Sequence, residues 1–298
     1  DLQQDFFEAC RGSDIIVYHP GATMGYFAAR HMNIPAVLAA PFPMTPTRAF
    51  PALLFYDKPR LGGTAHWLTH KIFEQIMWSA SASPVKKFFR REFGSLPSEY
   101  GNPFARQTTR RYPTIVSCSP AVFARPADWP AHVHMTGYWF LDEEPDLKPT
   151  PDLEEFLRRG VPPIYVGFGS VGDSTRAEQT TELVISAVQQ AGARAVLAAG
   201  WAGMAHPMHQ AEDIFFVKSV PHAWLFPRMA AVVHHGGAGT TAAGFRSGVP
   251  SVIIPFTNDQ FAWGARAFEL GVSPAPVPRK KLTAEKLAQA IRLVMGEE

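Results

Sequence analysis

The stretch Val232-Val233-His234-His235-Gly236-Gly237-Ala238-Gly239-Thr240-Thr241 carries the strongest structural signal in this sequence. An apolar strand ends there in two histidines, and a glycine-rich turn then opens a helix predicted to run to Arg246. The first backbone N–H groups of such a helix are unpaired and lie at the positive end of its dipole. With an imidazole beside them, they suit a phosphate or a diphosphate. The alternative is a tight strand-to-helix turn that needs small residues only for packing.

A second polar segment strengthens the ligand interpretation. The cluster Phe256-Thr257-Asn258-Asp259-Gln260 follows the next predicted strand, at residues 251–255. The carboxyl ends of neighbouring strands are where open α/β sheets bind ligands. The turn lacks the Gly-Lys-Ser/Thr of a P-loop, and it is not a dinucleotide fingerprint in its usual place after a first strand. The sequence therefore predicts an anion site of another kind at this sheet edge.

Composition bounds the class of protein. The 298 residues are 46% hydrophobic and 18% charged, which indicates a folded chain with room for two domains. The net charge of +2 decides nothing about nucleic acid, but no dense Lys/Arg stripe occurs, so we expect no nucleic-acid partner. Cys10 and Cys118 have no metal-binding spacing and are typical of reduced thiols in a cytoplasmic protein.

Any membrane contact is expected to be peripheral, because we recognise no signal peptide and no apolar run of bilayer length. The one compact basic run is Lys86-Lys87-Phe88-Phe89-Arg90-Arg91. It is typical of the solvated side of an amphipathic helix. The alternative is a contact with anionic lipid headgroups, because Phe88, Phe89 and Phe93 lie among the charges.

Strand and helix patterns alternate along the chain, which predicts an α/β protein with parallel sheets covered on both faces. In the first part we expect strands at residues 15–18, 36–39, 114–118 and 132–135, and helices at 21–31, 67–79 and 84–93. In the second we expect strands at residues 164–168, 195–198, 214–217, 231–234 and 252–254, and helices at 178–190, 258–270 and 283–295. The acidic, proline-rich residues 142–151 predict an extended linker.

The signature also resembles a known family. The block HHGGAGTTAAGFRSGVPSVIIPF, followed by Asp259-Gln260 and Trp263-Gly264, resembles the donor-binding signature of family 1 nucleotide-sugar glycosyltransferases of the GT-B fold. It is most similar to the sterol glucosyltransferase branch. Further motifs fall in that family's order at residues 137–142, 163–170, 200–203 and 220–228.

The resemblance implies an organisation of two Rossmann-like, doubly wound domains facing a cleft. Residues 1–141 would form an incomplete acceptor-side domain, 142–151 the linker, and 152–298 the donor-binding domain. Both ends are expected to be cut, because the family has further strands before residue 1 and continues after residue 298.

The resemblance also assigns donor residues. His235 would contact the phosphates, and Asp259 with Gln260 would bind the sugar hydroxyls, for which acid and amide groups are apt. The remaining donor residues implied are Ser170, Trp201, Val220, Gly237, Gly239 and Thr240. Some have structural alternatives: Asp259 as a helix N-cap with Gln260 exposed, Ser170 as an N-cap, and Trp201 in the core. His234 should point to the opposite face and be packed.

Ala243 departs from many members of the family, which carry a glutamate for the ribose hydroxyls at this place. Ribose recognition must then come from residues that the sequence does not identify. No Asp-x-Asp pair occurs near the donor motifs, so we expect catalysis without a bound metal or other cofactor.

The acceptor side is less well defined by the sequence. The proline-rich residues 43–51 resemble a loop of the sterol enzymes, and Met44, Thr45, Arg48 and Phe50 would line a pocket for an apolar acceptor. They would suit an ordinary core as well. The family's catalytic base is a histidine upstream of this sequence; His19, after the first strand, is the substitute available here, although lining the acceptor pocket suits it better.

The sequence therefore leads to one expectation and two alternatives. The expectation is an inverting glycosyltransferase that moves glucose from UDP-glucose to a hydroxyl of a lipophilic, sterol-like acceptor, in the cytoplasm or peripheral to a membrane. The first alternative is a donor-binding half of a split enzyme, inactive alone. The second is a UDP-sugar epimerase, which would need a further carboxylate beside Asp259.

Overall fold

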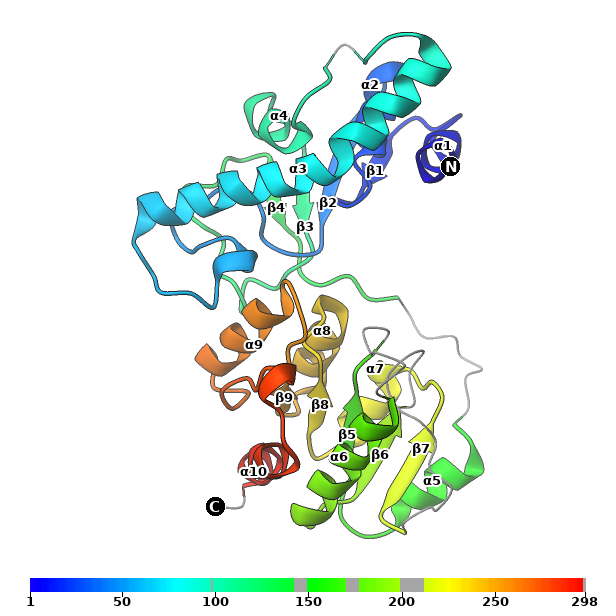
Figure 1. Ribbon diagram of the computed structural model, residues 1–298, viewed down its shortest axis with the longest axis vertical. Helices are drawn as coiled ribbons and strands as arrows, with labels where there is room; N and C mark the ends of the chain where they lie inside the picture. Colours follow the sequence, from blue (N-terminus) through cyan, green and yellow to red (C-terminus); the bar gives the residue numbers. More distant parts are fainter. Residues whose placement is uncertain (98, 142–148, 170–176, 199–211, 297–298) are drawn as a thin grey trace. The chain divides into compact units, whose positions relative to one another are not determined.

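The structure is a computed structural model that describes residues 1–97, 99–141, 149–169, 177–198 and 212–296 (Figure 1). The chain divides into two compact units, Asp1–Trp139 and Phe140–Glu298. Of the predicted linker, residues 142–148 lie outside the described residues. Each unit contains one parallel sheet with helices packed against it.

The first unit is built on a four-stranded parallel sheet of order β1-β2-β3-β4. Its strands are β1 (Ile16–Tyr18), β2 (Ala36–Ala40), β3 (Thr114–Val116) and β4 (Val133–Met135), close to their predicted positions. The helical segments are α1 (Leu2–Ala9), α2 (Met24–Met32), η1 (Leu53–Phe55), α3 (Gly63–Phe93) and α4 (Pro103–Thr109).

Helix α3 corrects the prediction of two separate helices at residues 67–79 and 84–93. It is one helix of 31 residues with Pro84 inside it, and Figure 1 shows it running across the first sheet. A proline inside a helix costs about 3 kcal/mol or more. Here Trp78 precedes Pro84 and Val85 follows it in one buried aromatic cluster, so burial of both flanks offsets that cost.

The same cluster overturns the lipid-contact interpretation of the basic run for two of its aromatic residues. Phe88 and Phe89 are buried and pack around Phe7 of α1, with ring centroids 5.2 and 6.0 Å from its ring. Buried rings cannot enter a headgroup layer. The exposed large apolar side chains of α3 lie mainly in its first half, at Trp67, Leu68, Ile72 and Ile76.

The second unit is built on a five-stranded parallel sheet of order β7-β6-β5-β8-β9. The strands are β5 (Ile164–Gly167), β6 (Ala195–Ala198), β7 (Ile214–Val217), β8 (Val232–His234) and β9 (Ser251–Ile253). The helical segments are α5 (Pro151–Arg158), α6 (Ala177–Gln190), α7 (His222–Leu225), η3 (Phe226–Arg228), α8 (Ala238–Ser247), α9 (Gln260–Glu269), η4 (Arg279–Lys281) and α10 (Ala284–Met295).

Helices cover both faces of this sheet, as the continuous apolar runs of its strands predict. In β5, Ile164 and Val166 belong to the core cluster that contains the buried residues of α6 and α10. Tyr165 points the other way, into a cluster with α5 and α7. The doubly wound architecture predicted for this part of the chain is therefore confirmed.

The strand order places the candidate site. From β5 the chain winds outward through β6 to β7, then returns to β8 on the other side of β5. The carboxyl ends of β5 and β8 thus form a topological switch point, where open α/β sheets bind ligands. The segments that follow these two strands begin at Phe168 and at His235.

Candidate functional site

The His235 ring lies between the turns that follow β5 and β8. A Cβ atom at Gly169, after β5, would lie 3.0 Å from His235 Cε1, and one at Gly237 only 2.5 Å from His235 Nε2. Gly169 also has a φ of +62°, which disfavours other residues. Both glycines therefore hold open the space that the imidazole occupies at the switch point.

The His235 ring is buried and carries an unpaired nitrogen at the switch point. Its side chain is 92% buried, since 8% of its surface is exposed, and Nδ1 has no hydrogen-bond partner among the described residues. Burial lowers the pKa of His235, which keeps the ring neutral at pH 7. A neutral imidazole with an unpaired nitrogen in a polar turn can form one hydrogen bond to a bound group.

The start of α8 supplies the donors predicted for an anion. Gly237 occupies the N-cap position, and no side chain in the described part of the protein caps the helix there. Gly239 is exposed and Thr240 is half-buried, so the first turn is accessible. The uncapped N–H groups at the positive end of this ten-residue helix are the kind of donors that a phosphate group accepts from.

Two further histidines surround this turn. His234 is fully buried, as predicted, and its Nδ1 accepts a hydrogen bond from Gly236 N at 3.1 Å. Burial, with smaller effects from His235 and His222, lowers the pKa of His234 to about 3. His222, at the start of α7, stacks on Phe226 with centroids 4.3 Å apart, and burial followed by the charge of His235 lowers its pKa. All three rings are therefore neutral at pH 7.

The structure gives Asp259 and Gln260 roles that differ from the capping alternative. Asp259 does not cap α9 with its side chain within the described residues; its Oδ2 accepts a hydrogen bond from Trp263 Nε1 at 3.0 Å. Burial raises the pKa of Asp259, and the Trp263 bond opposes that effect. Gln260 is buried rather than exposed, and its Oε1 accepts from Phe256 N at 2.8 Å and Thr257 N at 3.1 Å.

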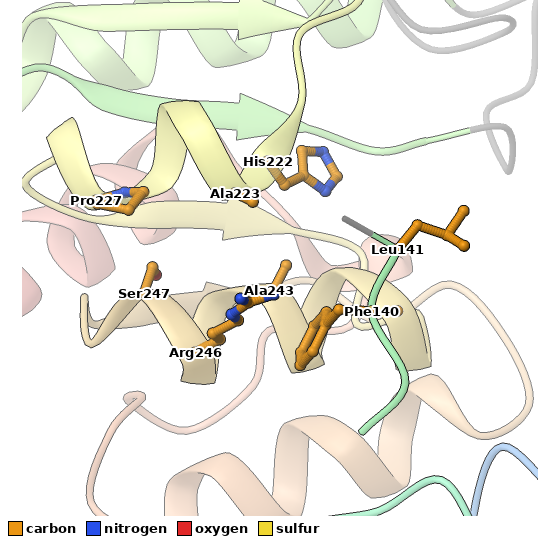
Figure 2. A pocket seen from close by; sticks show the side chains of 9 residues that line it. Phe140, Leu141, His222, Ala223, Pro227, Ala243, Arg246 and Ser247 are labelled. Carbon is orange, nitrogen blue, oxygen red and sulfur yellow. The ribbon is translucent and has the colours of Figure 1, made fainter. Parts of the chain in front are cut away.

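A pocket of about 460 Å³ lies beside α8, within the second unit (Figure 2). Figure 2 shows the ring of His222 projecting from α7 toward Leu141, and Arg246 beside Phe140 across α8. The Arg246 guanidinium lies 4.4 Å from the centroid of the Phe140 ring. The lining residues are Phe140, Leu141, His222, Ala223, Pro227, Gly239, Ala243, Arg246 and Ser247.

The other predicted donor residues are distributed unevenly. Of those placed by the structure, Gly239 lines the pocket beside α8, whereas Val220 lines a separate pocket between α5 and β7. Ser170 and Trp201 lie outside the described residues. Arg246 was not predicted as a ligand residue, although the spacing of Gly239, Ala243 and Arg246 on one helical face was available in the sequence.

The residues predicted for an acceptor pocket are largely buried in the first unit. Met44 and Phe50 are only 2% and 7% exposed. The Met44 carbonyl oxygen lies 3.3 Å from His70 Nδ1, and the Phe50 carbonyl oxygen lies 3.1 Å from His70 Nε2. Thr45 is also buried, and its carbonyl accepts from Trp129 Nε1 at 3.0 Å, whereas Arg48 is exposed. This segment is therefore a packed, anchored loop, as in the core interpretation of its apolar residues.

His19 follows β1 and is exposed, but its hydrogen bonding does not suit a catalytic base. Its Nδ1 accepts a hydrogen bond from Gly21 N at 3.0 Å. The proton of the neutral ring must then lie on Nε2, which leaves no free lone pair for the proton of an acceptor. In this arrangement the lining role suits His19 better.

The described residues offer neither a candidate metal centre nor a candidate membrane-spanning helix. Across those residues, no group of three or more His, Cys, Asp or Glu side chains is placed to hold a metal ion. None of the helices described is both long and apolar enough to cross a membrane.

Comparisons with known proteins agree with this architecture. Residues 182–298 match the family described as "Erythromycin biosynthesis protein CIII-like, C-terminal domain". The chain is 38% identical over 297 residues to a sterol 3-beta-glucosyltransferase of Candida albicans, covering 96% of this chain and 19% of that protein. It is 34% identical over 284 residues to a sterol 3-beta-glucosyltransferase of Arabidopsis thaliana, covering 95% of this chain and 45% of that protein.

The fold is similar to that of solved glycosyltransferases. The glycotransferase of kitacinnamycin aligns with a TM-score of 0.68 at 16% identity, over 99% of this chain and 72% of that one. The chain therefore spans less than half the length of the two sterol 3-beta-glucosyltransferases and 72% of the length of the kitacinnamycin glycotransferase.

Proposed function

We propose that this chain takes part in the transfer of glucose from UDP-glucose to a sterol-like hydroxyl. The chain belongs to the family 1 glycosyltransferases of the GT-B fold, and it is homologous to sterol 3-beta-glucosyltransferases over nearly its whole length. The observation that carries the donor half is the switch-point site, where a neutral His235 ring meets the uncapped start of α8. These groups all belong to the second unit.

The diphosphate of the donor would occupy the first turn of α8. His235 would form one hydrogen bond with it, while N–H groups of Gly239 and its neighbours and the Thr240 hydroxyl would form others. In the transition state, negative charge grows on the departing diphosphate, and donors fixed before the reaction stabilise that charge without reorganising. The helix dipole acts in the same direction.

The glucose would be bound by Asp259, with Gln260 in support. Asp259 lies at the start of α9 beside the switch-point turn, because Gly236 packs against the backbone of Gln260. Its carboxylate has one oxygen bonded to Trp263 and can accept a sugar hydroxyl on the other. Gln260 already uses its carbonyl oxygen to hold Phe256 and Thr257, so only its amide NH₂ group can contribute to the sugar.

Transfer with inversion would follow in one displacement. The acceptor oxygen forms a bond to the anomeric carbon while the bond to the diphosphate oxygen breaks, and the acceptor proton passes to a general base. The hydrogen bond at His19 argues against it as that base. If the chain binds UDP but transfers nothing, the donor-binding half becomes the better description.

His235→Ala is expected to weaken UDP binding tenfold or more. The variant removes one strong hydrogen bond to a diphosphate, worth about 1.5–3 kcal/mol. Calorimetric titration with UDP measures the effect. His134→Ala, at an exposed position of β4 in the first unit, is the matched control and should bind as the parent does. An unchanged dissociation constant in His235→Ala would exclude His235 from the site.

Asp259→Ala is expected to weaken UDP-glucose binding about tenfold and to leave UDP binding within twofold, because its carboxylate reaches the hexose alone. Asp259→Asn is the control for the Trp263 bond, since an amide oxygen also accepts it. Gln260→Ala would not test sugar binding equally well, because it removes the buried oxygen that accepts hydrogen bonds from two backbone N–H groups. Equal losses for UDP and UDP-glucose in Asp259→Ala, restored by Asn, would indicate a purely structural role.

A further inference from the structure

The pocket beside α8 begins where the proposed diphosphate site ends. Gly239 belongs to the first turn of α8 and also lines the pocket, and Ala243 and Arg246 continue the same face of the helix. The ribose of a nucleoside diphosphate is joined to the diphosphate through only its 5′ oxygen and 5′ carbon, so a diphosphate at that turn places the ribose close to Gly239. The volume of about 460 Å³ lies in the range of small-molecule pockets.

The polar side chains of this pocket are the Arg246 guanidinium, the His222 imidazole and the Ser247 hydroxyl, and the hydroxyl donates to the Gly244 carbonyl at 2.7 Å. Arg246 forms no ion pair with any described residue, and the Phe140 ring beneath it fixes the guanidinium plane by a cation–π contact. The Phe226 ring stacks on the His222 ring, and Tyr165 OH lies 3.4 Å from His222 Nε2. None of the nine described residues lining the pocket is acidic.

A pocket whose charged group is a guanidinium binds ligand hydroxyls in a different way from a pocket that contains a carboxylate. A carboxylate accepts hydrogen bonds from hydroxyls, whereas a guanidinium can only donate to hydroxyl oxygens. The methyl side chain of Ala243, one turn before Arg246, leaves the space between α8 and α7 open. The Arg246 guanidinium is also exposed and forms no ion pair with a described residue, so a ligand hydroxyl can take the place of water on its N–H groups.

We propose that Arg246 donates hydrogen bonds to the ribose hydroxyls of the nucleotide, with His222 as a second polar contact, so that Arg246 sets the preference for a ribonucleotide over a 2′-deoxyribonucleotide. This inference rests on the proposed function, because it takes the diphosphate to bind at the start of α8. Phe140 positions Arg246 for this role and makes no polar contact of its own with the ribose.

The test compares UDP with 2′-deoxy-UDP by calorimetric titration of the whole chain. The parent is expected to bind UDP about tenfold more tightly, the size of one hydrogen bond to a charged group. In Arg246→Ala that ratio should fall to about one, while 2′-deoxy-UDP binds nearly as before. Arg246→Lys should restore the ratio only in part, because a single ammonium replaces the guanidinium fork.

Arg228→Ala is the matched control. Arg228 also stacks on an aromatic ring, with its guanidinium 4.3 Å from the Trp224 centroid, but it does not line the pocket. It should leave the ratio at the parent value. His235→Ala should lower the affinity for both nucleotides equally, because it contacts the phosphates.

Each other outcome overturns the inference. Equal losses for both nucleotides in Arg246→Ala, fully restored by Lys, would mean that Arg246 acts as a charge on the phosphates. Unchanged affinities for both nucleotides in Arg246→Ala would mean that the ribose lies elsewhere, with the proposed function intact. Failure of the parent to bind either nucleotide would refute the proposed function and this inference together.

Discussion

Gly236→Ala is expected to destabilise the second unit by about 2–5 kcal/mol, because the new methyl group adds both backbone strain and a steric clash. Gly236 has a φ of +86°, where a side chain costs about 1–2 kcal/mol. A Cβ there would lie 2.8 Å from Ile253 Cγ2 and 3.1 Å from the carbonyl oxygen of Gln260. Overpacking of a rigid core adds about 1–3 kcal/mol. The melting temperature should fall by about 5–15 °C, measured by calorimetry.

Gly248→Ala separates the backbone contribution to this loss of stability from the overpacking contribution. Gly248 ends α8 with a φ of +71°, but nothing lies within 4 Å of the position of its Cβ among the described residues. It should therefore lose only the backbone contribution of about 1–2 kcal/mol. Equal losses in the two variants would show that the turn relaxes around the new methyl group at residue 236. A relaxed turn would in turn weaken the argument that the switch-point site is rigid before the donor binds.

The second sheet could be predicted closely from the sequence, because its strands are buried on both faces. The expected strands at residues 195–198 and 214–217 match β6 and β7 at both ends. Their apolar runs are bounded by Arg194 and Gly200 and by Asp213 and Lys218, which mark the ends. The start of α9 was placed two residues early, because the sequence does not reveal that the Gln260 side chain turns back onto the preceding loop.

Helix α3 shows where local rules fail. A proline normally ends a helix at the preceding residue, so residues 67–93 were divided in two. What holds Pro84 inside the helix is the packing of Trp78 and Phe89 on Phe27, which lies in α2. Contacts between residues about fifty positions apart cannot be read from a local pattern, and they outweigh it.

The candidate site was predictable only in part for the same reason. The glycines and His235 can be recognised from their spacing, because the strand, turn and helix that position them are consecutive in the sequence. Whether Met44 faces a ligand or the core depends on where distant segments pack, and here they bury it. Arg246 was overlooked because its partner in the pocket, Phe140, lies more than a hundred residues earlier in the chain.

Acidification is expected to destabilise the second unit through His234 by about 1.4 kcal/mol per pH unit below the ordinary histidine pKa. Burial lowers the pKa of folded His234 to about 3, against 6.5 for the free side chain. Between these values the unfolded chain binds a proton that the folded chain does not, so stability falls as the pH falls. The stabilisation is complete above about pH 6.5 and is lost progressively toward pH 3.

Burial is the main cause of the lowered pKa of His234, and a hydrogen bond in the turn gives the test its control. Gly236 N donates to Nδ1 of His234, so a proton on Nδ1 would place two donors face to face in a buried site. His234→Asn keeps an acceptor oxygen for Gly236 N but cannot titrate, so its stability between pH 6 and 4 should fall less steeply than the parent's, by up to about 1.4 kcal/mol per pH unit. Urea titrations at a series of pH values measure the slopes, and His134→Asn, exposed in the first unit, should retain the parent slope.

Identical slopes in parent and His234→Asn would mean that His234 accepts its proton without unfolding the turn. The Gly236 N–H would then lose its acceptor, and the proposed anion site at the start of α8 would be loosened by acid rather than lost with the fold.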